Sequence, residues 1–145
     1  VKPWDQLEVA DWERALRGNL LGSYFCMKAA LAGMRKRQWG RVVNIGYSRA
    51  EHLGAFPTIA PYAVAKTGLL VLTRTAAAAE VGNGITVNMV SPGLMRGGAL
   101  PPAKNLSESQ IGTFDDVAEA VAFCASDKAA AVTGSNLIVA GTWKM

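Results

Sequence analysis

The sequence is poor in the residues that build metal centres and disulfide scaffolds. It contains one histidine and two cysteines, Cys26 and Cys124, among 145 residues. The cysteines lie far apart and lack the Cys-x-x-Cys spacing of zinc sites, which excludes a disulfide scaffold. With a single histidine they leave too few ligands for a metal centre, so we expect no bound metal. We predict that both thiols are buried and pack as small hydrophobic groups.

Long hydrophobic runs are also missing. The run at 68–72 is among the longest, and a membrane-spanning helix needs about 20 apolar residues. No basic stretch followed by an apolar segment and a small-residue cleavage site opens the chain, so we expect a cytoplasmic protein with no membrane partner. The chain begins with Val1 rather than Met. Processing, trimming, or derivation from a longer protein would each explain that start.

Charge of one sign is only modestly in excess, with 15 Lys and Arg against 11 Asp and Glu. Half of the residues are hydrophobic, which is typical of one folded globular domain. The basic side chains gather at 35–41, where they form either an anion-binding patch or the cationic end of a helix. Because only Trp39 is available there for stacking on bases, we favour the second interpretation and expect no nucleic-acid partner.

Hydrophobic periodicity predicts three helices. The first carries apolar residues at helical spacing, starts from Asp11 as its N-cap and ends before Gly40. The second begins at Pro61, and the third follows Thr113, which has the hydroxyl of a good N-cap. The predicted helices cover 12–37, 61–81 and 115–126.

Short β-branched runs between these helices predict buried strands at 41–46, 85–90 and 137–139. Helices that alternate with buried strands are typical of a parallel sheet with right-handed crossovers. The fold class is therefore α/β, a partial Rossmann-like, doubly wound parallel sheet with three strands. The longest irregular stretch, 94–113, is interpreted as a binding loop or lid.

In such a sheet, sites form beyond the carboxyl ends of the strands. Tyr62 and Lys66, one helical turn apart, follow the first strand and a loop that carries Ser48. An ammonium group beside a phenol lowers the pKa of the phenol from its ordinary value of about 10, which prepares it for acid–base work. A neighbouring hydroxyl such as Ser48 would hold a carbonyl oxygen. A Tyr–Lys pair at this spacing is common on helix surfaces, but its place at the start of this helix strengthens the hypothesis.

These residues and their neighbours resemble the short-chain dehydrogenase/reductase family, most closely its 3-oxoacyl-acyl-carrier-protein reductases. The resemblance covers nearly the whole chain in the right order and matches the C-terminal half of the family domain. The segments that carry the resemblance are Asp11–Gly22, Ser48, Tyr62-Ala63-Val64-Ala65-Lys66, Gly84–Gly93, Thr113–Ala118 and Val132-Thr133-Gly134.

The resemblance implies hydride transfer between NAD or NADP and a small carbonyl or alcohol substrate. It implies that Tyr62 donates or accepts the proton and that Lys66 lowers the pKa of Tyr62 and holds the nicotinamide ribose. Ser48 would steady the substrate oxygen, and Asn19 would hold a water in a proton relay. The residues implied to line the nicotinamide pocket are Pro92, Gly93 and Leu94.

The sequence departs from the family pattern in two respects. No Gly-x-x-x-Gly-x-Gly turn occurs in it, so we expect residues 1–145 to form a single partial domain without the dinucleotide-binding half. Counting back from Tyr62 without a gap, the position of the family's serine falls on Tyr47 or Arg49 rather than on Ser48. Either Ser48 or Tyr47 would then supply the hydroxyl. The alternative function is a non-catalytic dimerisation or interaction module. In either case the family resemblance implies a homo-oligomer that associates through the 12–37 and 61–81 helices.

Overall fold

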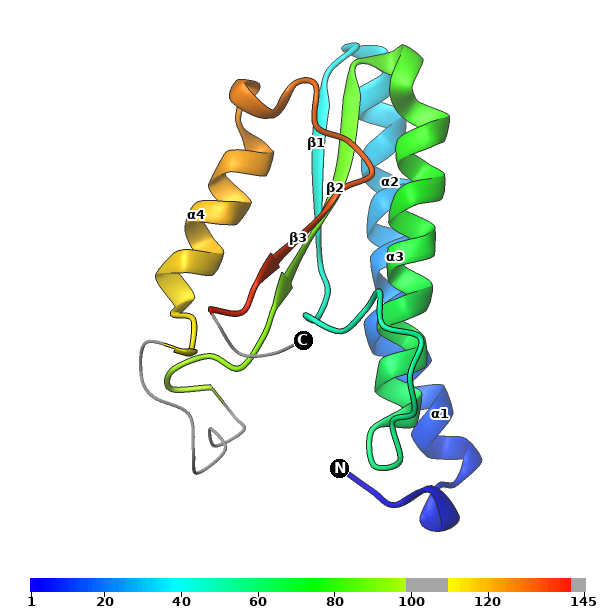
Figure 1. Cartoon of the computed structure of the whole chain (residues 1–145). Coiled ribbons are helices and arrows are strands. Elements are labelled where there is room, and N and C mark those ends of the chain that lie inside the picture. The colour runs from blue at the N-terminus through cyan, green and yellow to red at the C-terminus, as the bar shows by residue number, and fades with distance from the viewer. Residues whose placement is uncertain (99–109, 142–145) are drawn as a thin grey trace.

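The computed structural model describes residues 1–98 and 110–141. Helices and strands alternate along the described chain, as the periodicity predicts (Figure 1). The helices and strands are α1 (Val9–Leu16), a π-helical turn (Arg17–Leu21), α2 (Gly22–Lys36), β1 (Gly40–Ile45), α3 (Ala60–Glu80), β2 (Ile85–Pro92), α4 (Phe114–Ala125) and β3 (Asn136–Val139). Most of the expected loop at 94–113 lies outside the described residues.

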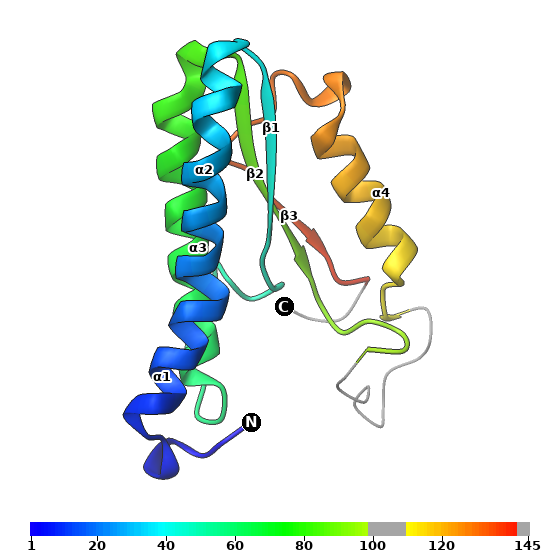
Figure 2. The ribbon, with the colours of Figure 1, turned by 180° about the vertical axis from the view of Figure 1, so that it is seen from behind.

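The three strands form one parallel sheet in the order β1-β2-β3. Gly40 pairs with Ile85 at the start of β1, and Pro92 pairs with Val139 at the end of β2. Helices α2 and α3 cover one face of the sheet and α4 covers the other, as Figures 1 and 2 show from opposite sides. This arrangement confirms the predicted α/β class.

The first predicted helix differs from the structure at both ends and in its middle. Glu8 is the N-cap, and Asp11 occupies the third helical position, where its carboxylate accepts the Glu8 backbone N–H at 3.0 Å. Asp11 as N-cap was therefore wrong, because this carboxylate closes a capping box from inside the helix. The π-helical turn inserts a wider ring at Arg17–Leu21, so that α1 and α2 are separate segments rather than one regular helix.

Strand β1 has one edge paired and one edge open in the described part of the chain. Gly40 at its start and Gly46 just after its end donate backbone N–H groups to the oxygens of Gly84 and Val90, on the side of β2. Because successive residues of a strand present their backbone groups to opposite sides, the intervening alternate residues direct theirs to the other edge. Those residues are Arg41, Val43 and Ile45.

The core lies between β2 and the α2–α3 pair. Ile85 and Val87 of β2 pack with Met27 and Ala77, and Met89 packs in a second cluster nearer the end of the strand. The residues of that second cluster are Ala50, Leu69, Leu70 and Met89. Burial of this kind stabilises each large side chain by about 1.5–3 kcal/mol, which fixes α3 against the sheet.

The prediction for the cysteines is confirmed for Cys124 and wrong for Cys26. Cys124 of α4 is fully buried against the sheet, whereas Cys26 is exposed. Cys26 lies on the side of α2 that borders an open groove along β1. No sheet residue therefore covers its thiol.

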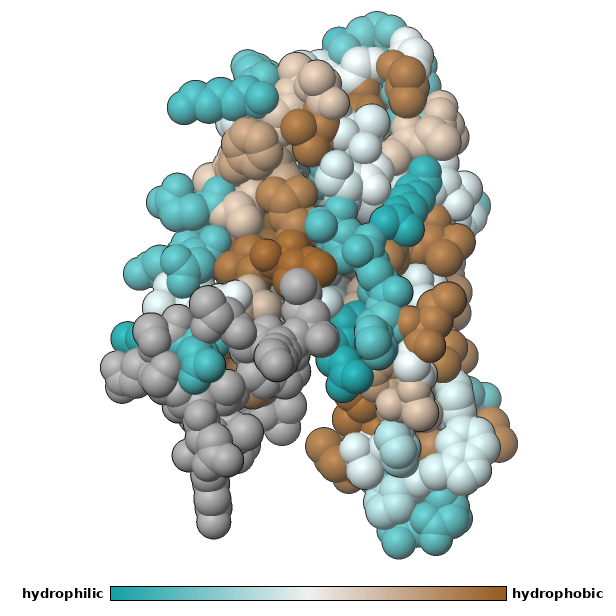
Figure 3. Space-filling view, in the orientation of Figure 1, coloured by the Kyte–Doolittle hydropathy of each residue, from teal (hydrophilic) through white to brown (hydrophobic). Residues whose placement is uncertain are grey.

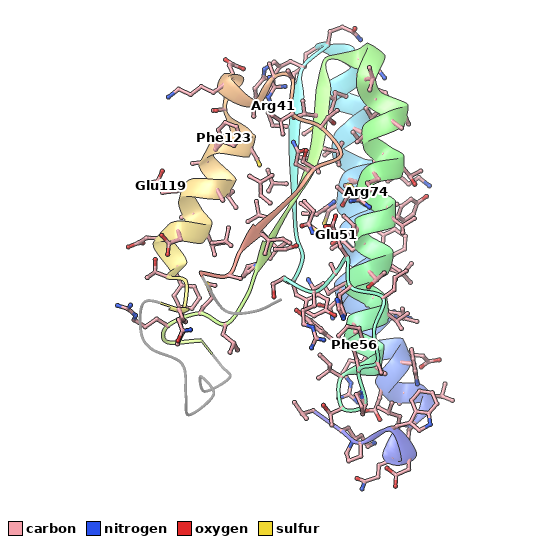
Figure 4. The ribbon with its side chains drawn as sticks, in the orientation of Figure 1. Arg41, Glu51, Phe56, Arg74, Glu119 and Phe123 are labelled. Carbon is pink, nitrogen blue, oxygen red and sulfur yellow. The ribbon has the colours of Figure 1, made fainter. Side chains whose placement is uncertain are left out.

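Much of the basic stretch at 35–41 is engaged in ion pairs. Arg35 makes a bidentate contact with Glu80, whose side chain is 2% exposed. Arg41, drawn in Figure 4, contacts Asp127 at 3.3 Å and stacks 5.1 Å from the centroid of the Trp39 ring. The first pair joins the ends of α2 and α3, the second joins β1 to the turn after α4, and both give the cationic stretch a structural role.

Candidate active site

One cavity of about 620 Å³ opens beyond the carboxyl ends of β1 and β2. Its walls come from the π-helical turn, the loop after β1, the first turns of α3 and the end of β2. The seven residues singled out from the sequence all line this cavity: Asn19, Ser48, Tyr62, Lys66, Pro92, Gly93 and Leu94. The fold thus brings together segments that are far apart in the chain.

Tyr62 and Lys66 project from the first two turns of α3, which starts with Pro61 near its N-terminus. The Lys66 Nζ atom lies 5.7 Å from the centroid of the Tyr62 ring and donates a hydrogen bond of 2.6 Å to the Ile45 backbone oxygen. The Tyr62 hydroxyl makes no hydrogen bond within residues 1–98 and 110–141. It is therefore free to contact a substrate oxygen.

The role of Lys66 in lowering the pKa of the Tyr62 phenol stays a prediction. Burial raises the pKa of Tyr62 above its ordinary value of 10.0. Burial also lowers the pKa of Lys66 from 10.5, because the charged amine is partly removed from water. The Lys66 amine donates its hydrogen bond to the Ile45 oxygen rather than to the Tyr62 phenol.

Tyr47 and Ser48 both reach the cavity, so the two candidates for the hydroxyl stay side by side. The Ser48 side chain is buried, and its backbone N–H donates to the Pro92 oxygen at 2.9 Å. The Tyr47 ring lies edge-on to the Tyr62 ring with centroids 5.4 Å apart. The buried Tyr47 hydroxyl has no partner in the described chain.

Asn19 lies in the π-helical turn, where it donates from Nδ2 to the Ala15 backbone oxygen at 3.1 Å. This turn widens the helix and sets the side chain beside the cavity that Lys66 also lines. Single π-helical turns within α-helices are frequent at functional sites. The amide oxygen of Asn19 is left available to accept a hydrogen bond.

The end of β2 closes the cavity with backbone rather than with side chains. Gly93 donates its N–H to the Val139 oxygen at 2.9 Å, which holds it beside β3. A Cβ atom on Gly93 would press on Ala140, at 2.6 Å from its Cβ atom, and would lie 3.6 Å from the Ser48 Oγ atom. Glycine at this position therefore keeps the cavity wall close to Ser48.

Sequence reasoning gave no site role to Arg49 or Phe56. Arg49 lines the cavity, its Nε atom is buried without a partner in the described residues, and its guanidinium stacks 4.9 Å from the Phe56 ring centroid. Phe56 in turn lies 6.1 Å from the Tyr47 ring. Counting back from Tyr62 without a gap does reach Arg49, but it marks this residue only as one that stands where the family has a serine.

The residues fit the nicotinamide end of a dinucleotide coenzyme. The hydroxyls of Tyr47 and Tyr62, which have no partner in the described residues, and the amine of Lys66 offer donors to a ribose or carboxamide. The backbone at Gly93 permits close approach. No cluster of three metal-ligating side chains occurs among the residues described. Within the same ranges, none of the helices is both long and apolar enough to cross a membrane.

Comparison with known proteins places this geometry in a family. A family model described as enoyl-(acyl carrier protein) reductase matches residues 2–142. The chain belongs to the short-chain dehydrogenase/reductase family. It is 39% identical over 149 residues to 2-(S)-hydroxypropyl-CoM dehydrogenase 3 of Xanthobacter autotrophicus. The matched region covers 92% of this chain and 58% of that protein.

A second relative is the 3-oxoacyl-[acyl-carrier-protein] reductase FabG of Pseudomonas aeruginosa, 39% identical over 90% of this chain and 56% of its own. Among solved structures, a gluconate 5-dehydrogenase from Burkholderia cenocepacia in complex with NADP and tartrate is similar, with a TM-score of 0.84 and 31% identity. That match covers 96% of this chain and 58% of the other. The chain thus spans a little over half the length of these relatives.

Proposed function

We propose that this cavity serves an NAD- or NADP-dependent oxidoreductase acting on a small carbonyl or alcohol, including 3-oxoacyl thioesters. The observation that carries the proposal is the convergence of Tyr62, Lys66, Ser48 and Asn19 on one cavity at the carboxyl ends of parallel strands. The names of the relatives, which are dehydrogenases and reductases, support the same class of reaction. The solved relative with NADP supports a nicotinamide coenzyme.

The proposed chemistry divides the work among the four side chains. A nicotinamide coenzyme, when bound, supplies or accepts the hydride. The Tyr62 hydroxyl gives its proton to the carbonyl oxygen, and burial raises the pKa of this phenol above its ordinary value. Ser48 or Tyr47 holds that oxygen by a hydrogen bond, Lys66 binds ribose hydroxyls, and Asn19 holds a water that returns the proton.

We propose further that residues 1–145 act as one partial domain. Without a Gly-x-x-x-Gly-x-Gly turn in the sequence, the cavity grips the nicotinamide end, and the coenzyme diphosphate is bound by polypeptide outside these residues. Both cysteines are free thiols, which fits the reducing cytoplasm that we propose as its location.

A second candidate function is a non-catalytic interaction module. One relative that is 39% identical over 149 residues is named an inactive 2-(S)-hydroxypropyl-CoM dehydrogenase 2. The helices also expose apolar side chains, among them Phe25 of α2 and Val64 and Val71 of α3. Brown apolar patches interrupt the polar surface in Figure 3, including along the side of α3. We propose that these helices join copies of the chain.

The deciding experiment follows coenzyme absorbance with a panel of ketones and 3-oxoacyl thioesters. It uses both the chain printed here and the protein read from the complete coding sequence. Tyr62→Phe is expected to lower turnover at least about 100-fold, because it removes the proton donor. Tyr24→Phe, on the exposed side of α2, is the matched control. Full activity in Tyr62→Phe would refute the proposed role, and association without turnover in either protein would favour the interaction module.

A further inference from the structure

Arg49 is a cationic side chain at the active-site cavity without a carboxylate partner in the described chain. Its Nε atom is buried and makes no hydrogen bond there. A buried donor without a partner is destabilising, and more so when the group is charged. The described part of the chain therefore leaves this donor unsatisfied.

The acid closest in sequence does not neutralise this charge. Glu51 is paired with Arg74 of α3, and Figure 4 shows these two side chains near one another beside the helix. Arg49 instead stacks on Phe56, with its Cζ atom 4.9 Å from the ring centroid. Stacking on an aromatic face holds the guanidinium plane and leaves its N–H edges for planar anions such as carboxylates.

A second unsatisfied donor lies on the path from Arg49 to the proposed proton donor. The Tyr47 hydroxyl is buried without a partner in the described residues. The Tyr47 ring packs edge-on against Phe56 on one side, at 6.1 Å, and against Tyr62 on the other, at 5.4 Å. Arg49, Tyr47 and Tyr62 all line the cavity, and Phe56 contacts both Arg49 and Tyr47.

We propose that Arg49 and the Tyr47 hydroxyl form an anion subsite, so that the substrate is a carbonyl or alcohol compound carrying a carboxylate, phosphate or sulfonate. This inference rests on the proposed function, since Tyr62 marks the reacting end of the same cavity. The aromatic rings between Arg49 and Tyr62 separate the anionic group from the reacting carbon by several atoms. Charge-assisted hydrogen bonds from a guanidinium give such a subsite its affinity.

A coenzyme phosphate carries the same chemistry as an anionic substrate, so the test separates the two sources. Calorimetric titration compares 4-oxopentanoate with its uncharged methyl ester on the full chain, without coenzyme. NADP and inorganic pyrophosphate are titrated in parallel. The variants are Arg49→Gln and Tyr47→Phe, and Arg14→Gln removes the same charge from an exposed position on α1.

The acid is expected to bind at least about tenfold more tightly than the ester, and Arg49→Gln should abolish that preference. Tyr47→Phe should weaken acid binding severalfold while leaving the fold intact, because it deletes only a hydroxyl that has no partner in the described chain. Arg14→Gln should change neither ligand's affinity.

Equal affinity for the acid and the ester in the unmodified chain would overturn the proposal. So would an Arg49→Gln variant that loses NADP or pyrophosphate binding while keeping the acid. Binding requires no turnover, so an anion preference in this chain, together with no turnover by the protein read from the complete coding sequence, would refute the proposed function and leave the anion subsite standing. Conversely, turnover of the methyl ester at the same efficiency as the acid would support the proposed function and refute the subsite.

Discussion

The Lys66 Nζ atom donates its 2.6 Å hydrogen bond to the backbone oxygen of Ile45, on the open side of β1. The amine is thereby held 5.7 Å from the centroid of the Tyr62 ring. Because Ile45 ends β1 and Lys66 lies in the second turn of α3, this bond joins the edge of the sheet to the proposed site. Partial burial makes the charged form of Lys66 costly, which lowers the pKa of Lys66.

Lys66→Met is expected to raise the melting temperature at neutral pH while abolishing coenzyme-dependent turnover. Between the lowered pKa of Lys66 and its unfolded value of 10.5, the unfolded chain binds more protons, so the stability of the unmodified protein rises with pH there. The advantage of the Met variant should therefore shrink as pH rises through that window. Melting curves at neutral and alkaline pH measure it, and Lys28→Met at an exposed site of α2 is the control. A Met variant less stable than the parent at neutral pH would contradict this account.

The Arg35–Glu80 pair should make stability depend on acid. The Arg35 guanidinium holds the pKa of the buried Glu80 carboxyl below its ordinary value of 4.5. A carboxylate with a lowered pKa adds stability above the unfolded pKa, and that stability is lost as pH falls through the folded pKa. Glu80→Gln should accordingly be less stable than the parent at neutral pH, with the difference closing below pH 4.5.

Chemical denaturation at a series of pH values checks this prediction. Hydrogen bonds also lower the pKa values of the Asp11 and Asp116 carboxyls. Both groups are present in the parent and in the variant, so their contributions to the pH dependence cancel in the comparison. Glu119→Gln, at an exposed site of α4 that Figure 4 labels, is the matched variant. A gap between parent and Glu80→Gln that stays constant with pH would disprove the coupling.

Two glycines after α3 should respond differently to alanine. Gly84 has a left-handed φ of 65°, and a Cβ atom there would collide with the Gln38 backbone oxygen. Gly84→Ala is therefore expected to lower the free energy of unfolding by at least about 1 kcal/mol. Gly82 has open space around its Cβ position, so Gly82→Ala should change stability little. Urea denaturation compares them, and similar losses in both variants would show that the left-handed turn is unimportant.

Val71 tests the proposed association of copies through the helices. Its side chain is 62% exposed on α3, one heptad after the exposed Val64. A charge placed in an apolar contact opposes its burial, so Val71→Asp should shift sedimentation toward the monomer. Val9→Asp changes an equally apolar but separate surface at the start of α1 and should leave the distribution unchanged. An unaltered distribution in Val71→Asp would argue against this interface.

The sequence predicted the strands well because their apolar, β-branched runs are bounded by glycine and proline. Strand β1 begins at Gly40 rather than at residue 41, and β2 extends to Pro92, two residues beyond the expected end. That extension depends on pairing with Val139 of β3, a contact that local sequence does not encode. Thr113 caps α4 as expected, because its hydroxyl accepts the Asp116 backbone N–H at 3.2 Å.

The seven predicted residues line one cavity because the motifs lie at or near the carboxyl ends of the strands, which meet at one edge of the sheet. The chemical roles of these residues stay predictions. What the sequence could not provide was the environment of each group. The direction of the Tyr62 pKa depends on burial by neighbouring segments, and the bond from Lys66 to Ile45 depends on tertiary packing. The stacking of Arg49 on Phe56 depends on the path of the loop between β1 and α3.

The edge of β1 carries a consequence for handling the protein. The backbone groups of Arg41 and Val43 are open to any extended peptide that meets them, since no strand in the described ranges occupies that side. The Ile45 oxygen already accepts the Lys66 amine. Such an edge can template intermolecular sheet growth, and the Arg41 side chain, which is 7% exposed and paired with Asp127, offers little free charge to oppose it. Aggregation should therefore increase with protein concentration, and Val43→Lys should reduce it by placing a charge on the open edge.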